Sequence, residues 1–224
     1  MEYVLLQLFR NYCTPEWQEV TRANLTRLIY APGEPIFKEG QPCQNMYLVA
    51  RGRVKVFARY GPDTEVILRL VGDHEVLGHR GLGDDMIYPV TAEALTETRL
   101  NFLPIQVFND LLKANPEFCF HFLYFMAEEL KRSETQRKDQ LNMTVRQRVA
   151  WGLQKNMNAF GFDTQDKKLL TYSLSRKDLT AVANTTYESV VRTLASFEQE
   201  GIIELVNKQI RILNKRLLGK AIRG

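Results

Sequence analysis

Glycines recur between residues 32 and 103, and short runs of strand-forming residues lie between them. The runs cover 46–49, 53–57 and 66–71, and they are rich in the β-branched and aromatic residues that favour strands. Short strands with a glycine at each corner are typical of a β-sandwich or β-barrel. This segment therefore predicts an all-β domain that ends at Pro104, with corners at Gly33, Gly40, Gly52, Gly61, Gly72 and Gly78.

Helical patterns flank this β region. The first thirty residues have a helical pattern, with a start signal at Thr14-Pro15-Glu16, where a hydroxyl precedes a proline at the first helical position. A short helix is expected over 105–113. A long helix is expected from Pro116 to about Met143, because this stretch contains no glycine and no internal proline.

The first half of the long helix is hydrophobic on more than one face, so it needs more than one partner. We expect one face to pack on the β domain and the other to pack on a second copy of the chain. Complete burial within one chain is the alternative. The second half, 131–140, is strongly polar, so any pairing there is narrow or weak. The hydrophobic residues of the first half are Phe118, Phe120, Phe122, Leu123, Tyr124, Phe125, Met126 and Leu130.

The last third of the chain carries the signals of a winged helix-turn-helix. Another amphipathic helix is expected over 145–160, followed by a loop over 161–168. Ser175 and Asp178 then match the Ser-x-x-Asp start of a short helix. Asn184 supplies a turn residue that tolerates positive φ. The second helix is expected over 187–199 with an inner face of Val190, Val191, Leu194 and Phe197.

Two short strands are expected after this helix, over 202–206 and 209–213, with a tight turn at Asn207-Lys208. They would form the wing. Residues 144–224 also hold 14 of the 30 Lys and Arg residues but only 7 of the 26 Asp and Glu residues. A basic C-terminal region attached to a mildly acidic remainder is the charge distribution of a DNA-binding protein. A basic surface that only faces solvent is the alternative.

Several classes of protein are disfavoured by the sequence. No run of 18 apolar residues and no secretory signal is present, which predicts a cytoplasmic protein without a membrane partner. Cys13, Cys43 and Cys119 are widely spaced, which predicts three buried thiols rather than a disulfide, a zinc site or an iron–sulfur cluster. The nucleotide-binding, zinc-protease and nucleophile-elbow motifs of common enzymes are absent, so we expect no catalytic residues.

The order of β domain, long helix and winged helix resembles the Crp/Fnr family of transcription regulators over nearly the whole chain. The stretch 32–40 and the run 46–49 resemble the first strands of the family's cyclic-nucleotide-type barrel. The resemblance implies an α+β fold, with a jelly-roll sensor domain over 1–115, a dimerisation helix over 116–143 and a winged helix over 144–224. The most specific matches are Arg176, Asp178, Leu179, Val182, Glu188, Val190, Arg192, Leu194, Glu198, Ile202 and Ile203.

The resemblance implies base-reading roles for Glu188 and Arg192, because the matching family residues contact the half-site of an inverted repeat. Arginine can bind guanine and glutamate can accept from cytosine, which fits these roles. Tyr187 and Ser189 complete the expected base-reading set. Glu188 also has a competing interpretation, since Thr185 and Glu188 together form a capping-box pattern. The expected phosphate contacts are Ser175, Arg176 and Lys208.

The β domain is expected to sense a small molecule other than cyclic AMP, or no small molecule at all. Cyclic-AMP-binding relatives carry Gly-Glu and Arg-Ser where this chain has Gly78-His79 and Tyr88-Pro89. A tyrosine cannot neutralise a phosphate and a proline has no N–H to donate. The effector pocket is expected to involve His79, Arg80, Gly81, Tyr88, Pro89, Arg99 and Ser133.

Other functions are kept open by the sequence. Solvent-exposed surface charge is the alternative for Arg80 and Arg99. Some family members bind haem, for which His74, His79 or His121 would supply a ligand. An interaction protein whose winged helix does not read bases is the other alternative. The expected partners are double-stranded DNA, a second copy of the chain and RNA polymerase.

Overall fold

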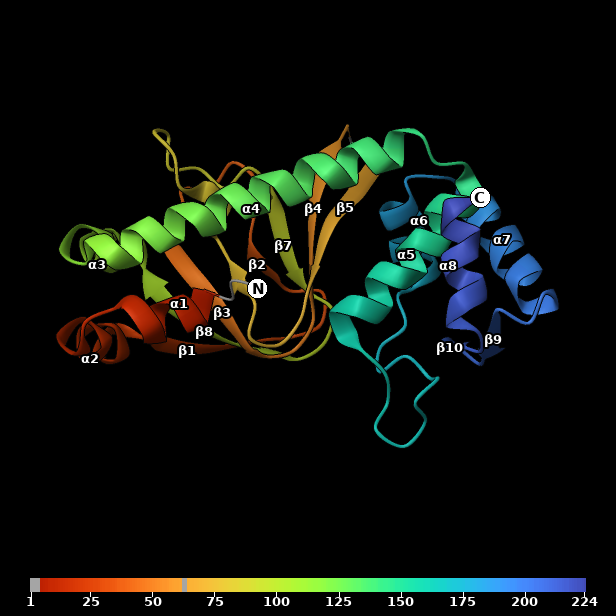
Figure 1. Cartoon of the computed structure of the whole chain (residues 1–224), viewed down its shortest axis with the longest axis horizontal. Coiled ribbons are helices and arrows are strands. Elements are labelled where there is room, and N and C mark those ends of the chain that lie inside the picture. The colour runs from red at the N-terminus through yellow and green to blue at the C-terminus, as the bar shows by residue number, and fades with distance from the viewer. Residues whose placement is uncertain (1–4, 62–63) are drawn as a thin grey trace. The chain divides into compact units, whose positions relative to one another are not determined.

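The β domain predicted from the glycine spacing is present as two four-stranded sheets. The computed structural model describes residues 5–61 and 64–224, and Figure 1 labels strands of both sheets and the long green helix α4. The strand orders are β1-β8-β3-β6 and β2-β7-β4-β5. The strands are β1 (Thr26–Tyr30), β2 (Pro35–Phe37), β3 (Asn45–Arg51), β4 (Val54–Tyr60), β5 (Thr64–Val71), β6 (Val76–Leu77), β7 (Thr91–Ala94) and β8 (Thr98–Pro104).

Strand β1 corrects the prediction that the first thirty residues are helical. The helices there are α1 (Leu5–Tyr12) and α2 (Pro15–Asn24), with Pro15 at the first helical position as expected. Residues 1–4 lie outside the described residues. The chain then becomes extended, because Thr26–Tyr30 contains β-branched and aromatic residues and pairs antiparallel with β8, from Thr26 opposite Phe102 to Tyr30 opposite Thr98. Tertiary pairing therefore overrides the helical pattern in this segment.

The helices after the barrel lie close to their predicted ranges. They are α3 (Ile105–Ala114), α4 (Pro116–Leu141) and α5 (Val145–Phe160), and a 3-10 turn, η1 (His79–Gly81), lies between β6 and β7. One face of α4 joins the hydrophobic core through Phe118, Phe122 and Phe125. Edge-to-face ring contacts link this face to the neighbouring helices, as between Phe108 and Phe122 at 5.2 Å.

The winged helix-turn-helix is also present, with one helix that the sequence did not predict. Its elements are α6 (Arg176–Ala183), α7 (Tyr187–Gln199), β9 (Ile203–Val206), β10 (Gln209–Ile212) and α8 (Lys215–Arg223). The unexpected helix is α8, which packs on α5. Its N-cap is Asn214, whose side chain accepts a hydrogen bond from the Leu217 N–H at 3.0 Å. An Asn three residues before a Leu-Leu pair is the signal that could have predicted it.

The described residues belong to two compact units. The first contains the described residues of 5–56 and 71–136, and the second contains those of 57–61, 64–70 and 137–224. Cys13 and Cys43 are buried, but Cys119 is exposed on α4, so the prediction of three buried thiols is wrong for Cys119. Cys119 follows the buried Phe118 directly, and a helix turns consecutive side chains to different faces. Within the described residues, no helix is long and apolar enough to span a membrane.

Candidate functional site

The turn between α6 and α7 is fixed by hydrogen bonds at each helix end. Ser175 caps α6, because its hydroxyl accepts from the Asp178 N–H at 3.0 Å and donates to the Asp178 carboxylate at 2.5 Å. Asn184 ends α6 in the left-handed conformation, with φ of 46°. Thr186 then caps α7 by accepting from the Ser189 N–H at 3.3 Å. These caps set the direction in which α7 leaves the turn.

The cap at Thr186 resolves the competing interpretation of Glu188. Thr185 is not the N-cap residue, so Thr185 and Glu188 do not form the capping box that their spacing suggested. Glu188 is the second residue of α7 and is exposed, as is Arg192 one turn later. Ser189, in contrast, is partly used by the cap, since its hydroxyl accepts from the Thr186 hydroxyl at 3.1 Å.

The exposed face of α7 includes one residue that the sequence placed in the core. Val190, Leu194 and Phe197 are buried as predicted, but Val191 is 44% exposed, so its assignment to the inner face is wrong. At about 3.6 residues per turn, the three buried side chains already span the inner face and Val191 falls outside it. Tyr187 is 51% exposed near the start of the same helix.

Two arginines of α5 support the turn and the second helix. The Arg148 guanidinium donates to the carbonyl oxygens of Ala183 at 2.8 Å and Asn184 at 3.3 Å. The Arg146 guanidinium lies 4.5 Å from the centre of the Phe197 ring and donates to the Glu200 carboxylate at 2.6 Å. From the sequence alone, both residues contribute only to the basic charge of residues 144–224. The structure uses them to hold the helices in place.

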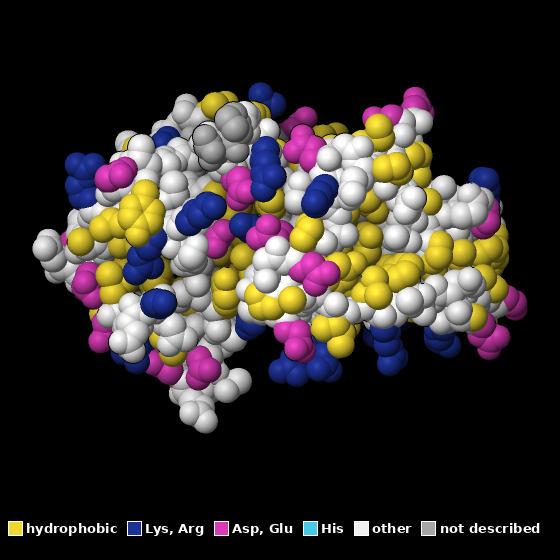
Figure 2. Space-filling model, turned by 180° about the vertical axis from the view of Figure 1, so that it is seen from behind, with side chains coloured by type: hydrophobic (Ala, Val, Ile, Leu, Met, Phe, Trp, Pro, Cys, Tyr) yellow, Lys and Arg dark blue, Asp and Glu magenta, His cyan; other side chains and the backbone are white. Residues whose placement is uncertain are grey.

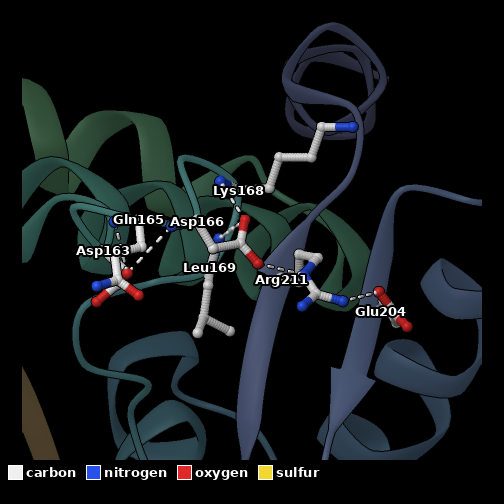
Figure 3. A network of polar contacts seen from close by, with 7 residues as sticks. All are labelled: Asp163, Gln165, Asp166, Lys168, Leu169, Glu204 and Arg211. Atoms are coloured by element: carbon white, nitrogen blue, oxygen red, sulfur yellow. Dashed lines mark hydrogen bonds and ion pairs between the residues drawn. The ribbon is translucent and has the colours of Figure 1, made fainter.

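The wing is braced against the loop that precedes α6. Figure 3 shows the Arg211 guanidinium of β10 between two carboxylates, donating to Asp166 at 2.8 Å and to Glu204 at 2.5 Å. The Asp163 carboxylate accepts from the N–H groups of Gln165 at 2.9 Å and of Asp166 at 3.1 Å. Lys208 is exposed beside Asn207, whose φ of 58° makes the tight turn.

This network predicts that the second unit loses stability in acid. Backbone N–H donors lower the pKa of the Asp163 and Asp166 carboxyls below 3.8, and for Asp166 the Arg211 guanidinium lowers it further. A lowered pKa in the folded state contributes stability above about pH 4, and the contribution is lost as the pH falls toward the lowered pKa. Thermal unfolding followed by Trp151 fluorescence in a Trp17→Phe background should show this loss below pH 4. An Asp166→Asn variant should have a smaller drop, and an equal drop would contradict the prediction.

In the first unit, the turn η1 is joined to α4 by charged side chains. Glu129 is buried on α4, and its carboxylate lies 3.5 Å from His79 Nε2 and 3.4 Å from an Arg80 guanidinium nitrogen. Arg132, three residues along α4, lies 3.6 Å from the other carboxylate oxygen. The His79 ring also packs edge-to-face on Phe125, with ring centres 5.5 Å apart. Glu129 was not among the predicted site residues, and its signal in the sequence is an acidic residue at a position of the apolar helical stripe.

The interior beside this turn is filled by aromatic side chains. Tyr88 is buried and its ring stacks on Phe37 with centres 4.0 Å apart. The Tyr88 hydroxyl donates to the Asn45 carbonyl at 2.8 Å and accepts from the Asn45 N–H at 3.1 Å. Burial raises the pKa of the Tyr88 phenol, so it stays neutral. A Cβ added at Gly81 would lie 2.7 Å from the Cys43 sulfur, so this glycine allows close packing.

The structure brings four of the predicted effector residues together, and the other three, Pro89, Arg99 and Ser133, are exposed. His79, Arg80, Gly81 and Tyr88 share one region, because the Cβ position of Gly81 lies 3.0 Å from the Tyr88 ring. Ser133 is exposed one turn after Glu129 on α4, and Pro89 is also exposed. Arg99 lies on β8 and pairs with Glu97 at 3.4 Å.

The three histidines of the haem alternative have separate surroundings. His74 is exposed in a turn, His79 is buried beside Glu129, and His121 stacks on Tyr12 with ring centres 3.6 Å apart. Within the described residues, no group of three His, Cys, Asp or Glu side chains is arranged to hold a metal ion. His79, the buried one of the three, faces the Glu129 carboxylate.

Neutralising Glu129 is expected to lower the stability of the first unit. A Glu129→Gln variant should cost about 1–3 kcal/mol, less than the ~3–5 kcal/mol for breaking a fully buried pair, because Arg80 and Arg132 can turn to solvent. The melting temperature should fall by several degrees. Glu128→Gln is the matched control, because Glu128 is exposed and pairs only loosely with Lys131 at 3.9 Å. Equal melting temperatures for the two variants would show that the cluster is not stabilising.

Comparison with known proteins gives matches to both units. A cyclic nucleotide-binding domain model matches residues 27–115, and a Crp-like helix-turn-helix domain model matches residues 147–221. The cyclic AMP receptor protein of Thermus thermophilus is 27% identical over 205 residues, covering 91% of each chain. The transcriptional activator protein anr of Pseudomonas aeruginosa is 26% identical over 185 residues, covering 81% of this chain and 74% of that one. The solved structure of FixK2 from Bradyrhizobium japonicum superposes with a TM-score of 0.77 at 21% identity, covering 88% of this chain and 96% of that one.

A nucleotide-binding-type barrel followed by a long helix and a winged helix-turn-helix defines a class of DNA-binding transcription regulator. The two domain matches and the full-length relatives agree with the order of elements in the structure. The chain belongs to the Crp/Fnr family of transcription regulators. The two relatives, a cyclic AMP receptor protein and an anr activator, match with nearly equal identity, so similarity alone does not single out an effector.

Proposed function

We propose that the protein is a homodimeric regulator that reads an inverted-repeat DNA site with Glu188 and Arg192 of α7. The observation that carries this proposal is the exposure of both charged side chains, one turn apart, on a helix whose other face is buried. The two side chains share one face, so they can meet adjacent base pairs in a major groove. Tyr187 and Ser189 would border the same readout.

The phosphate backbone would be held by groups around this helix. Lys208 is exposed at the tip of the wing, and Arg176 is partly exposed at the first position of α6. The Ser175 hydroxyl is already used in the cap, so its phosphate contact would be a second interaction of the same group. Such contacts position the protein without reading sequence.

The test of base reading is selection of DNA from a random pool by the full-length protein. The expected result is an inverted repeat whose half-sites lie about 34 Å apart, one helical turn of DNA. Enrichment without any repeated sequence would overturn base reading, and would favour a protein whose winged helix does not read bases. As a regulator, the protein would act with RNA polymerase in the cytoplasm, and the proposal assigns it no catalysed reaction.

The dimer would form along α4. Opposite its buried stripe, α4 exposes Phe120, Leu123, Tyr124 and Leu130. Figure 2 shows a band of exposed hydrophobic side chains on one face of the molecule, and exposed hydrophobic residues such as Ile29 and Tyr60 also lie outside α4, so exposure alone does not identify the interface. The spacing supports α4 as the interface, because positions 120, 123, 127 and 130 repeat at alternating intervals of three and four, the pattern of a two-helix coiled coil.

The effector, if the barrel takes one, would not be cyclic AMP. The Arg80 guanidinium, which lies in the same region as His79 and Tyr88, already faces the buried Glu129 and so is engaged before any cyclic phosphate could bind. Tyr88 and Phe37 also occupy the interior beside η1. Isothermal titration of the dimer with cyclic AMP is expected to give no measurable heat at micromolar concentrations. A saturable micromolar titration would overturn this part of the proposal.

A further inference from the structure

The exposed face of α7 has a hydrophobic edge beside Glu188 and Arg192. Tyr187, Val191 and Ala195 are all exposed, and they follow one another at intervals of four residues. Residues spaced in this way lie one above another on a helix. We call these three residues the apolar edge.

The apolar edge is not needed to pack α7 into its unit. Val190, Leu194 and Phe197 fill that role, and each is at most 1% exposed. A single exposed valine on a protein surface is ordinary and would need no explanation. This valine is different because it lies immediately before Arg192 and three residues after Glu188, on the face that the proposed function places against DNA.

The chemistry of a major groove offers one class of partner for such a side chain. Base edges there present hydrogen-bond donors and acceptors, and the thymine C5-methyl is the hydrophobic group among them. Val191 has two branched methyl groups and no polar atom, so it can gain from a base edge only by removing apolar surface from water. An adjacent methyl satisfies this requirement.

We infer that Val191 is a specificity-determining residue that contacts the C5-methyl of a thymine in each half-site. The inference rests on the proposed function, because it requires α7 to lie in the major groove. Since Val191 lies between Glu188 and Arg192 in sequence, the thymine should neighbour the base pairs that these two residues read. Tyr187, one turn earlier on the apolar edge, would shield the same contact from water.

The size of the effect follows from the burial of one methyl group. Removing it from the contact should weaken binding about fourfold per half-site, the fold-change that corresponds to one buried CH₂. Deoxyuridine lacks only this methyl and keeps the base-pairing and groove polar groups of thymidine. Replacing one thymine by deoxyuridine therefore tests the methyl contact and nothing else.

The experiment uses the duplex obtained by selection and titrates it with the full-length protein. Each thymine is replaced in turn, symmetrically in both half-sites, and the same set is measured with Val191→Ser and Val20→Ser variants. Val20 is the matched control, because it is a valine on α2 that is 40% exposed. Melting curves of both variants show whether either substitution affects folding.

The expected result is one thymine per half-site at which deoxyuridine weakens binding, by about fourfold per half-site, for the parent and for Val20→Ser. With Val191→Ser, thymidine and deoxyuridine should bind equally at that position. Sequence-specific binding without any sensitivity to the methyl, or with the same sensitivity in Val191→Ser, would overturn the inference and leave the proposed function intact. Failure to select any sequence would overturn both.

Discussion

An Arg192→Ala variant is expected to bind the selected inverted repeat more weakly and with relaxed specificity at one base position. The loss should be about 1–3 kcal/mol for each half-site, because a bidentate guanidinium contact to guanine is replaced by an unfilled base edge. Arg192 is exposed and lies outside the helix core, so its removal should leave the fold unchanged. Quantitative titration on a set of single-base variants of the half-site would measure both effects.

The control for this prediction is Lys208→Ala in the wing. Lys208 is also exposed and cationic, but its place at the tip of a tight turn suits a phosphate contact, which carries no sequence information. Its removal should weaken all sequences about equally and make the salt dependence shallower. Arg192→Ala could instead lower the affinity for selected and for random DNA by the same factor. Arg192 would then be a phosphate contact, and the prediction that it reads a base would be wrong.

Much of the fold could be predicted from the sequence where local signals and tertiary packing agree. The Ser175 cap, the left-handed Asn184 and the Asn207 turn each depend on a few neighbouring residues, and all three are present. Strand β1 could not be predicted in this way, because its pairing partner β8 lies about seventy residues away. The residue pattern within β1 carries no information about a pairing strand that far along the chain.

The candidate site shows the same limit at the level of single side chains. The exposure of Val191 depends on how α7 packs, because Val190, Leu194 and Phe197 already fill its inner face. The role of Glu129 depends on a turn some fifty residues earlier, which brings His79 and Arg80 to the same carboxylate. From the sequence, Arg146 and Arg148 of α5 contribute only basic charge, whereas in the structure Arg146 contacts α7 through Glu200 and Arg148 contacts the end of α6 through Ala183.

A Leu123→Asp variant is expected to be monomeric at concentrations where the parent is dimeric. Leu123 is 64% exposed on α4 and occupies the centre of the predicted seam. In a two-fold pair the substitution would place two carboxylates near each other in an apolar interface, and burying them unpaired is strongly unfavourable. Sedimentation equilibrium of both proteins measures the change directly.

The matched control is Ile29→Asp on β1, where the isoleucine is also 64% exposed. Both substitutions add one negative charge at an exposed hydrophobic position, so any general effect of charge on solubility is common to them. The control should stay dimeric, because β1 is not part of the seam. A Leu123→Asp protein that remained dimeric would show that α4 is not the interface.

Loss of the dimer should also weaken binding to the inverted repeat far more than it weakens binding to one half-site. Two linked winged helices gain roughly 10²–10⁴ in affinity over one, because the second half-site is bound at high effective concentration. A monomer loses this gain while each Arg192 contact remains intact. Titrating Leu123→Asp on a full repeat and on a single half-site therefore separates two requirements: the reading of bases by α7 and the pairing of subunits through α4. If the monomeric variant bound the full repeat as tightly as the parent does, pairing would not contribute to recognition, and the inverted-repeat proposal would be wrong.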